Sequence, residues 1–172
     1  VRRELGLPSD TWLGVGVDRL DYTKGIEERL LAVERLLERH PETRGRMVFV
    51  QLAAPSRSKI TRYKELAESV ERTAERINEI YGSHSYKPTV LLRAHHEPPT
   101  VFRYYRAADV CYVSSLHDGM NLVAKEFVAA RDDERGVLVL SHFTGAAREL
   151  TEALIVNPYD LDQASDALFS AL

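Results

Sequence analysis

Six short apolar runs alternate along this chain with segments of helical periodicity, and this alternation restricts the fold more than any other feature. The runs cover residues 12–17, 47–52, 90–92, 110–113, 137–140 and 154–156. Continuous apolar runs are typical of strands that are buried on both faces. Helices between them favour parallel connections, because a parallel neighbour requires a crossover. The sequence therefore predicts an α/β fold with a Rossmann-like parallel sheet and helices on both faces.

The helical segments carry their apolar residues on one side. Between Ile26 and His40, apolar residues recur at helical spacing, and Pro41 is expected to end that helix. A longer helix from Ile60 has one narrow apolar seam and is expected to end at Gly82. A coiled-coil partner is one interpretation of this seam, but packing on the domain's own sheet is favoured. Further helices are expected at 98–107, 121–130, 145–150 and 160–172.

Composition narrows the class of protein. The chain has 172 residues, 44% of them hydrophobic, which is enough for one domain with a core. A formal net charge of -3 argues against nucleic acid as a partner, and no apolar run is long enough for a membrane span. Without a signal peptide, a cytoplasmic location is expected. The single cysteine, Cys111, falls in a predicted strand and is interpreted as a buried structural thiol.

The residues with the most distinctive chemistry follow the predicted strands. In open α/β sheets, ligands bind beyond the carboxyl ends of the strands. Residues of this kind after the first five predicted strands are Asp18, Arg19, Asp21, Tyr22, Thr23, Lys24, Gly25, Pro55, Ser56, Arg57, His95, His96, His117, Asp118, Gly119, Met120, Asn121, Ser141, His142, Phe143, Thr144 and Gly145. One edge of the sheet is therefore expected to collect most of the candidate chemistry.

The segment from Asp118 to Glu126 has the features of a nucleotide-sugar site. It follows a predicted buried strand, makes a turn at Asp118-Gly119 and continues as a helix from Asn121. The free N–H groups and the dipole of a helix N-terminus favour an anion such as phosphate. Asp118 and Glu126 add carboxylates that can accept hydrogen bonds from sugar hydroxyls. Donors for phosphate and acceptors for sugar therefore lie within one short segment.

Two cations flank a tight loop after the first predicted strand. Arg19 and Lys24 precede the helix that begins at Ile26, an arrangement that suits a diphosphate. Gly25 would allow the backbone to approach a ligand closely. The alternative is a surface loop in which Arg19 pairs with Asp18 or with the acidic residue at 21.

Other polar residues near the strand ends allow several interpretations. Arg57 either binds a phosphate on an acceptor or caps the long helix. His95 and His96 are adjacent, so in an extended segment they should point to opposite sides, and no metal site is expected there. His117 is either a proton shuttle or a turn residue. Ser141 and the histidine after it lack the context of a hydrolase nucleophile elbow.

Three segments resemble motifs of the trehalose-6-phosphate synthases, and they occur in that family's order. The segments are 16–25, 118–126 and 154–160, and the resemblance extends over nearly the whole chain. It implies a retaining glycosyltransferase of the two-domain GT-B fold. Residues 1–172 would form its C-terminal, donor-binding domain, with the N-terminal acceptor domain absent from this chain. Since the chain starts without Met and stops inside a helical pattern, we expect a fragment of a longer enzyme.

The resemblance also implies a reaction and its participants. Glucose would be transferred from UDP-glucose to glucose 6-phosphate with retention at the anomeric carbon, giving trehalose 6-phosphate. No cofactor and no metal would be required beyond the nucleotide-sugar donor. The implied partners are these small molecules and the enzyme's own N-terminal domain, and a homo-oligomer stays open. This domain alone is expected to bind nucleotide without turnover.

The resemblance assigns individual residues to the donor and the acceptor. Arg19, Lys24 and Asp118 would be catalytic, the two cations holding the donor diphosphate and the carboxylate the donor sugar. Arg57 would reach the acceptor phosphate, and Glu126 would hold the ribose. The full set of implied donor contacts is Arg19, Lys24, His96, Asp118, Gly119, Met120, Asn121, Leu122, Val123 and Glu126.

Two departures from the family pattern keep other functions open. His117 stands where the family usually has Arg, and His95-His96-Glu97-Pro98 stands where an aromatic or aliphatic residue and then a basic one are expected. Both fall near the donor pocket. The first alternative is a pseudo-glycosyltransferase of validamycin biosynthesis that couples a GDP-cyclitol to an aminocyclitol phosphate, as validoxylamine 7'-phosphate synthases do. The second is a non-catalytic nucleotide-sugar-binding module.

Overall fold

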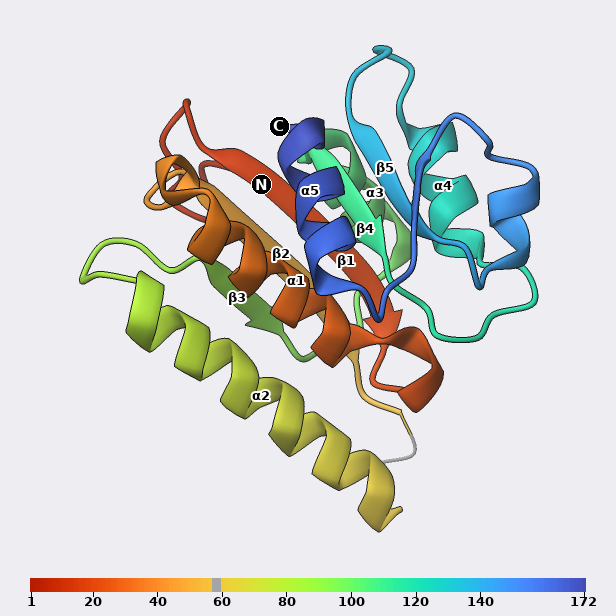
Figure 1. Cartoon of the computed structure of the whole chain (residues 1–172), viewed down its shortest axis with the longest axis horizontal. Helices are drawn as coiled ribbons and strands as arrows, with labels where there is room; N and C mark the ends of the chain where they lie inside the picture. The colour runs from red at the N-terminus through yellow and green to blue at the C-terminus, as the bar shows by residue number, and fades with distance from the viewer. Residues whose placement is uncertain (57–59) are drawn as a thin grey trace.

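The computed structural model describes residues 1–56 and 60–172, which form an α/β domain around one parallel sheet (Figure 1). Within these residues the sheet has six strands in the order β3-β2-β1-β4-β5-β6, and every neighbouring pair is parallel. The strands are β1 Trp12–Arg19, β2 Met47–Ala54, β3 Thr89–Leu92, β4 Val110–Val113, β5 Val137–Ser141 and β6 Leu154–Val156. The predicted Rossmann-like parallel sheet is confirmed.

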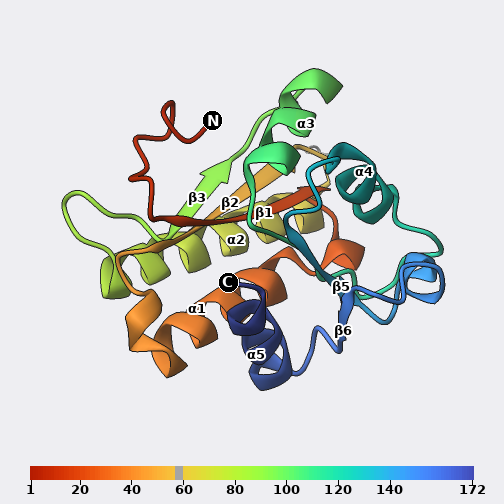
Figure 2. The same ribbon diagram turned by 90° about the horizontal axis from the view of Figure 1, so that it is seen from above.

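Helices cover both faces of the sheet, as predicted (Figure 2). One face packs against α1 Ile26–Arg39, α2 Thr61–Tyr81 and α5 Leu161–Ala171. The other face packs against α3 Pro98–Ala107 and α4 Leu122–Ala130. Three short 3-10 helices complete the described elements: η1 Tyr22–Lys24, η2 Pro41–Thr43 and η3 Gly145–Arg148. The strands β2, β4 and β5 contribute buried side chains to both layers, and their sequences are therefore almost continuously apolar.

The strand order places a topological switch point at the centre of the sheet. From β1 the chain moves outward through β2 to β3, then returns to β4 on the other side of β1 and moves outward again. The loops after β1 and β4 therefore leave the same edge of the sheet and diverge. Such a crevice is where open α/β sheets bind ligands. The topology therefore places Arg19, at the end of β1, and Asp118, in the loop after β4, at this crevice.

Several boundaries differ from the sequence prediction, among them the end of the first strand and the end of the helix expected at 145–150. The first strand was expected to end at Val17, but β1 continues through Asp18 and Arg19, which stay in register with β2. A carboxylate is tolerated at this buried position because Asp18 is paired with Arg29 of α1. The helix expected at 145–150 is only the short η3. It ends at Arg148, and the chain then turns toward β6.

The long helix α2 packs on its own domain, as favoured by the sequence. Ala67, Val70, Thr73, Ala74 and Ile77 form the buried seam. The seam joins the core that α1 and α5 share with the sheet. A coiled-coil partner is therefore not needed to bury it.

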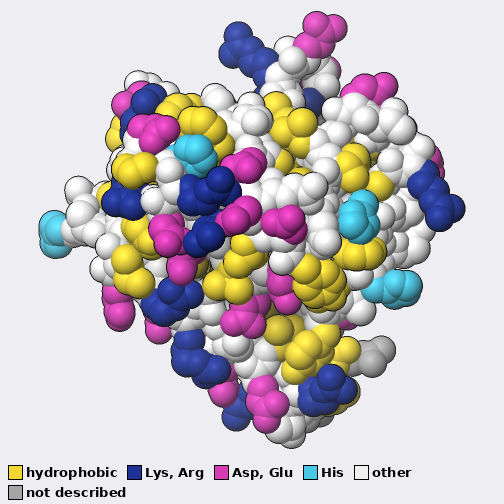
Figure 3. Space-filling view, viewed as in Figure 1, with side chains coloured by type: hydrophobic (Ala, Val, Ile, Leu, Met, Phe, Trp, Pro, Cys, Tyr) yellow, Lys and Arg dark blue, Asp and Glu magenta, His cyan; other side chains and the backbone are white. Residues whose placement is uncertain are grey.

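The face formed by α1, α2 and α5 carries both signs of charge (Figure 3). Ion pairs tie its helices together, for example Arg35 with Asp162 at 2.6 Å and Arg76 with Glu34 at 2.6 Å. Lys and Arg side chains are interspersed with Asp and Glu across this view. Over residues 1–56 and 60–172, no helix combines the length and apolar character that crossing a membrane demands.

We expect the thiol of Cys111 to resist modification in the native protein. Cys111 is completely buried in β4, and burial raises the pKa of its thiol to about 12. At mildly alkaline pH the native chain should therefore react with a thiol reagent only as fast as it unfolds, whereas the denatured chain should react at once. Stopped-flow labelling in increasing urea measures both rates. Rapid labelling of the native protein would contradict the buried position.

Candidate functional site

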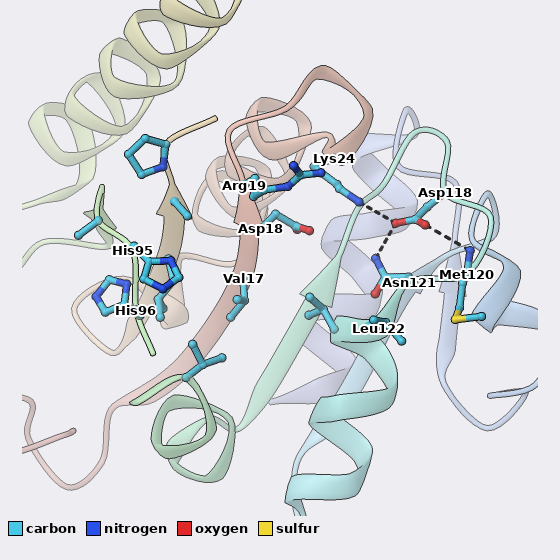
Figure 4. Close-up of a pocket in the computed structure, with 16 residues that line it drawn as sticks. Val17, Asp18, Arg19, Lys24, His95, His96, Asp118, Met120, Asn121 and Leu122 are labelled. Carbon is cyan, nitrogen blue, oxygen red and sulfur yellow. Dashed lines mark hydrogen bonds and ion pairs between the residues drawn. The ribbon is translucent and has the colours of Figure 1, made fainter. Parts of the chain in front are cut away.

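A cavity of about 660 Å³ opens at the carboxyl edge of the sheet (Figure 4). Its walls come from the ends of β1 and β2, the segment after β3, helix α3 and the turn that leads into α4. Among the predicted site residues, those that line it are Arg19, Lys24, His96, Asp118, Met120, Asn121, Leu122 and Val123. The structure thus brings together residues from both sides of the switch point.

An ion pair between Lys24 and Asp118 joins the loops after β1 and β4. The Lys24 Nζ lies 2.9 Å from Asp118 Oδ2, and the two side chains are 20% and 15% exposed. Figure 4 shows both side chains reaching toward each other across the top of the cavity. The residues are 94 positions apart in sequence, so only the parallel topology makes them neighbours. The pair sets a cation and a carboxylate side by side at the mouth of the cavity.

The Asp118 carboxylate is also held from its own loop. Its Oδ1 accepts a hydrogen bond from the Met120 N–H at 3.2 Å, and Oδ2 accepts one from the Asn121 side-chain amide at 3.1 Å. Partial burial raises the pKa of Asp118, but the hydrogen bonds from Lys24, Met120 and Asn121 outweigh this effect and hold it below the usual range. Asp118 is therefore ionised at neutral pH, with a fixed orientation.

Asn121 controls the start of α4 through an unusual backbone conformation. Its φ angle is 81°, a region that few residues other than glycine adopt. Its side-chain oxygen accepts a hydrogen bond from the Ala124 N–H at 2.8 Å, which makes it the N-cap. The helix begins at Leu122, so the N–H groups of Leu122 and Val123 have no partner within the helix. These donors and the helix dipole act at the cavity wall.

Arg19 lies beside Lys24, at the end of β1. The surface pairing considered for Arg19 does not occur: Asp18 binds Arg29, and Asp21 accepts hydrogen bonds from the Thr23 N–H and hydroxyl, each at 2.8 Å. Within residues 1–56 and 60–172, Arg19 forms no ion pair. Figure 4 shows its side chain next to that of Lys24. Two neighbouring cations thus border the cavity, one of them unpaired in this part of the chain.

Beneath these cations lies a charged residue that the sequence analysis missed. Arg29 is fully buried, and its guanidinium lies 2.7 Å from Asp18 Oδ2. It also donates to Gln51 Oε1 at 2.8 Å, to Ser114 Oγ at 2.9 Å and to the Lys24 carbonyl at 3.3 Å. Burial raises the pKa of Asp18, and the nearby guanidinium opposes that rise. One sequence signal pointed to this role, because Arg29 falls on the apolar face of its helix, three residues after Ile26.

The other end of the cavity is more apolar and carries two histidines. Val17, Leu52 and Val101 line it together with His95 and His96. Both histidines border the cavity, although strict alternation along an extended segment would place them on opposite sides (Figure 4). The segment after β3 is not a regular strand at this point, so the alternation of an extended chain does not apply.

Some predicted site residues lie elsewhere. Glu126 lies one turn further along α4 than Leu122 and does not line the cavity. Its Oε2 accepts a hydrogen bond from the Tyr105 hydroxyl at 3.1 Å. Gly119 adjoins the lining without being part of it, and His117 is exposed on the loop before it. Arg57 lies outside the described residues. In residues 1–56 and 60–172, no group of three or more His, Cys, Asp or Glu side chains is arranged to hold a metal ion.

Comparison with known proteins places these features in one family. The sequence profile of glycosyltransferase family 20 matches residues 7–172. The chain belongs to this family. The trehalose-6-phosphate synthase of Salmonella typhimurium strain LT2 is 50% identical over 157 residues, which cover 91% of this chain and 33% of that protein. The bifunctional trehalose-6-phosphate synthase/phosphatase of Thermoproteus tenax is 47% identical over 156 residues, covering 91% of this chain and 21% of that protein.

Solved structures of trehalose-phosphate synthases share the fold. The Escherichia coli protein bound with UDP-2-fluoro glucose aligns with a TM-score of 0.93 and 45% identity, covering 99% of this chain and 37% of that one. The Burkholderia xenovorans α,α-trehalose-phosphate synthase (UDP-forming) in complex with glucose-6-phosphate aligns with a TM-score of 0.95 and 42% identity, with the same coverage. The resemblance to the GT-B trehalose-6-phosphate synthases is therefore confirmed. The chain spans about a third or less of the length of the curated relatives named here.

Two substitutions of Asn121 should separate the stability that comes from its N-cap hydrogen bond from the cost of its positive φ angle. Asn121→Ala removes the cap at a positive φ and should lower the free energy of unfolding by about 1–2 kcal/mol. Asn121→Gly also loses the side-chain bonds but accepts the positive φ without strain, so it should cost less. Urea denaturation of both variants measures the difference. A glycine variant that is the less stable of the two would show that the backbone conformation is not the constraint.

The contribution of Asp118 to stability should disappear in acid. Its pKa in the folded chain lies below the ordinary value of 3.8. A depressed carboxyl pKa means that the stabilisation is complete above the unfolded pKa and is lost as the pH falls through the folded one. The wild type should therefore exceed Asp118→Asn in unfolding free energy at neutral pH, and this difference should shrink below the ordinary carboxyl pKa. A difference that does not change with pH would contradict the ion pair with Lys24.

Proposed function

We propose that residues 1–172 form the donor-binding domain of a retaining glycosyltransferase that moves glucose from UDP-glucose to glucose 6-phosphate, giving trehalose 6-phosphate. One observation carries the proposal: Arg19, Lys24 and the N-terminus of α4 meet around one cavity, with Asp118 between them. The relatives support the same substrates, since they include a UDP-forming trehalose-phosphate synthase and structures bound to a UDP sugar or to glucose-6-phosphate.

The two cations fit the chemistry of a diphosphate leaving group. As the glycosidic bond breaks, negative charge grows on the diphosphate. Arg19 and Lys24 on one side and the free N–H groups of Leu122 and Val123 on the other would stabilise that charge. Each such preorganised contact lowers the barrier by about 3 kcal/mol. The cations and the helix N-terminus together supply this stabilisation from the protein's own groups.

Asp118 suits the donor sugar better than the diphosphate. Its carboxylate is ionised, oriented by three hydrogen bonds and placed between Lys24 and the start of α4. An ionised carboxylate accepts hydrogen bonds from hydroxyls but repels phosphate. We assign it to a hydroxyl of the transferred sugar, with the N–H of Gly119 as a neighbouring donor. When the donor binds, Lys24 would exchange part of its contact with Asp118 for the diphosphate.

The carboxylates at the cavity favour a front-face mechanism with retention. Among the described lining residues these are Asp18 and Asp118, and each is held by a cation, Arg29 and Lys24 respectively. A carboxylate that is fixed in this way is poorly suited to attack the anomeric carbon. In the front-face mechanism, the leaving phosphate itself accepts the proton of the incoming acceptor hydroxyl. The acceptor then enters on the face that the diphosphate leaves.

The acceptor site is proposed to need a second domain. The curated relatives named above extend well beyond the matched region, which makes up 21% and 33% of their lengths. We assign the missing acceptor contacts to an N-terminal domain, together with Arg57 from the present chain. Glu126 is proposed to hold the ribose, which requires the donor to extend past Val123 along α4. The domain alone is therefore expected to bind the nucleotide without transferring glucose.

Calorimetric titration with UDP-glucose, UDP and GDP tests the proposal. We expect the chain to bind the UDP series, and Arg19→Ala to weaken UDP by at least about tenfold, as expected for one charge-assisted hydrogen bond. Arg39→Ala is the matched control, because Arg39 is a similarly exposed arginine at the far end of α1 that pairs with Asp166. It should leave binding unchanged.

The other outcomes identify the competing functions. Preference for GDP over UDP would favour the pseudo-glycosyltransferase that uses a GDP-cyclitol, for which the two histidines at the apolar end of the cavity are the relevant departure. Binding of UDP-glucose without transfer by a protein that also contains the N-terminal domain would favour a non-catalytic module. Transfer of glucose by the present chain alone would contradict the need for a second domain.

A further inference from the structure

Arg29 does not line the cavity, yet it contacts two residues that do. Its guanidinium binds the carboxylate of Asp18 and the backbone carbonyl of Lys24, and both residues belong to the cavity wall. We propose that Arg29 is a positioning residue that holds the diphosphate-binding loop in place through these two contacts. The inference rests on the proposed function, because it assumes that Lys24 binds a diphosphate.

The hydrogen bonds of Arg29 join elements on both sides of the switch point. Asp18 belongs to β1, Gln51 to β2, and Ser114 directly follows β4. The Ser114 hydroxyl accepts from Arg29 Nε at 2.9 Å and donates to the Gly25 carbonyl at 2.7 Å. The carbonyls of Lys24 and Gly25 are therefore both bound from below. The loop that presents the Lys24 ammonium is fixed to the floor of the crevice rather than to the surface.

The backbone is shaped to admit this network. A Cβ on Gly16 would lie only 2.6 Å from Arg29 Nη1 and would also collide with the Gln51 side-chain oxygen. Gly25 has a φ of 62°, and a Cβ there would collide with the Ser114 carbonyl oxygen. Both glycines thus stand where a side chain would push the network apart. The absence of a side chain at Gly16 and Gly25 therefore leaves room for the hydrogen-bond network of Arg29, in addition to the role of the loop in the proposed ligand site.

This arrangement allows the Lys24 side chain to move while its backbone stays in place. In the structure its ammonium contacts Asp118, and a bound diphosphate would draw it toward the phosphate oxygens. Because the Lys24 carbonyl is anchored, only the side chain needs to rearrange. Fixing a binding group in advance reduces the entropy lost when the ligand binds. Loosening the anchor should therefore weaken the phosphate contacts more than the contacts to the nucleoside.

A purely structural role for Arg29 makes a different prediction. A buried charge whose partner is removed destabilises a protein strongly, so loss of Arg29 could simply impair folding. Two mild variants avoid this problem. Arg29→Lys keeps the charge but cannot reproduce the planar set of hydrogen bonds, and Ser114→Ala removes only the hydroxyl that links Arg29 to the loop. Both should remain folded, which circular dichroism and thermal unfolding establish.

Titration of the chain with UDP and with uridine tests the proposal, using calorimetry for UDP and NMR shifts for uridine. We expect Arg29→Lys and Ser114→Ala each to weaken UDP about tenfold, the effect of one charge-assisted hydrogen bond, and to leave uridine binding unchanged. Two matched controls are Arg131→Lys, which alters a largely buried arginine bound to the carbonyl of Tyr105, and Ser165→Ala, which alters a buried serine of α5. Both controls should bind UDP and uridine like the wild type.

Each result bears on the proposal in a defined way. Folded Arg29→Lys and Ser114→Ala variants that bind UDP as tightly as the wild type would overturn it. Equal weakening of UDP and uridine, or similar weakening in the two controls, would also overturn it, because a general loss of stability would then be the cause. A wild-type chain that binds neither UDP nor GDP would overturn the proposed function itself, and this inference with it.

Discussion

The buried ion pair between Arg29 and Asp18 is the interaction on which the rest of the site depends. A charge without a partner in a protein interior costs several kcal/mol, so the residues around Arg29 must supply acceptors. Gln51 of β2 and Ser114, which directly follows β4, do so, and Gly16 leaves room for the guanidinium. Because Asp18 belongs to β1 and Arg29 to α1, the pair also sets the helix relative to the strand end. The connecting loop, with its cations, follows from that placement.

Topology supplies the second half of the site. The loops after β1 and β4 are far apart in sequence but adjacent in the sheet, because the chain reverses its direction of travel between these strands. Lys24 and Asp118 meet across that crevice, and α4 presents its N-terminus there. Positive groups on one side and the N–H groups of the first turn of α4 on the other surround the space between them. An anion that enters gains from both sides, whereas either loop alone would offer only a weak, solvent-screened contact.

Local signals made most of the fold predictable from the sequence. Continuous apolar runs predicted the strands, and helical periodicity predicted the helices. Both patterns depend only on residues that are close together in the sequence. The end of β1 was missed because Asp18 is tolerated in a strand only through Arg29, eleven positions away. Arg19, Lys24 and Asp118 were found as separate motifs, but the contact between Lys24 and Asp118 depends on strand order. Arg29 was missed because an arginine on a helix is ordinarily a surface residue.

The motifs shared with the family constrain the ligand at the end of the cavity that carries the two cations more than at its apolar end. The end with Arg19 and Lys24 is built from cations and a helix terminus, groups that suit any nucleoside diphosphate. The other end is built from Val17, Leu52 and Val101 with His95 and His96. Under the proposed function, this end would hold the nucleoside. Apolar walls accept any base by stacking and exclusion of water, so discrimination has to come from hydrogen bonds made by the segment after β3. Under the proposed function, the choice of nucleobase therefore rests on this segment, which lies outside the three segments that resemble the family's motifs.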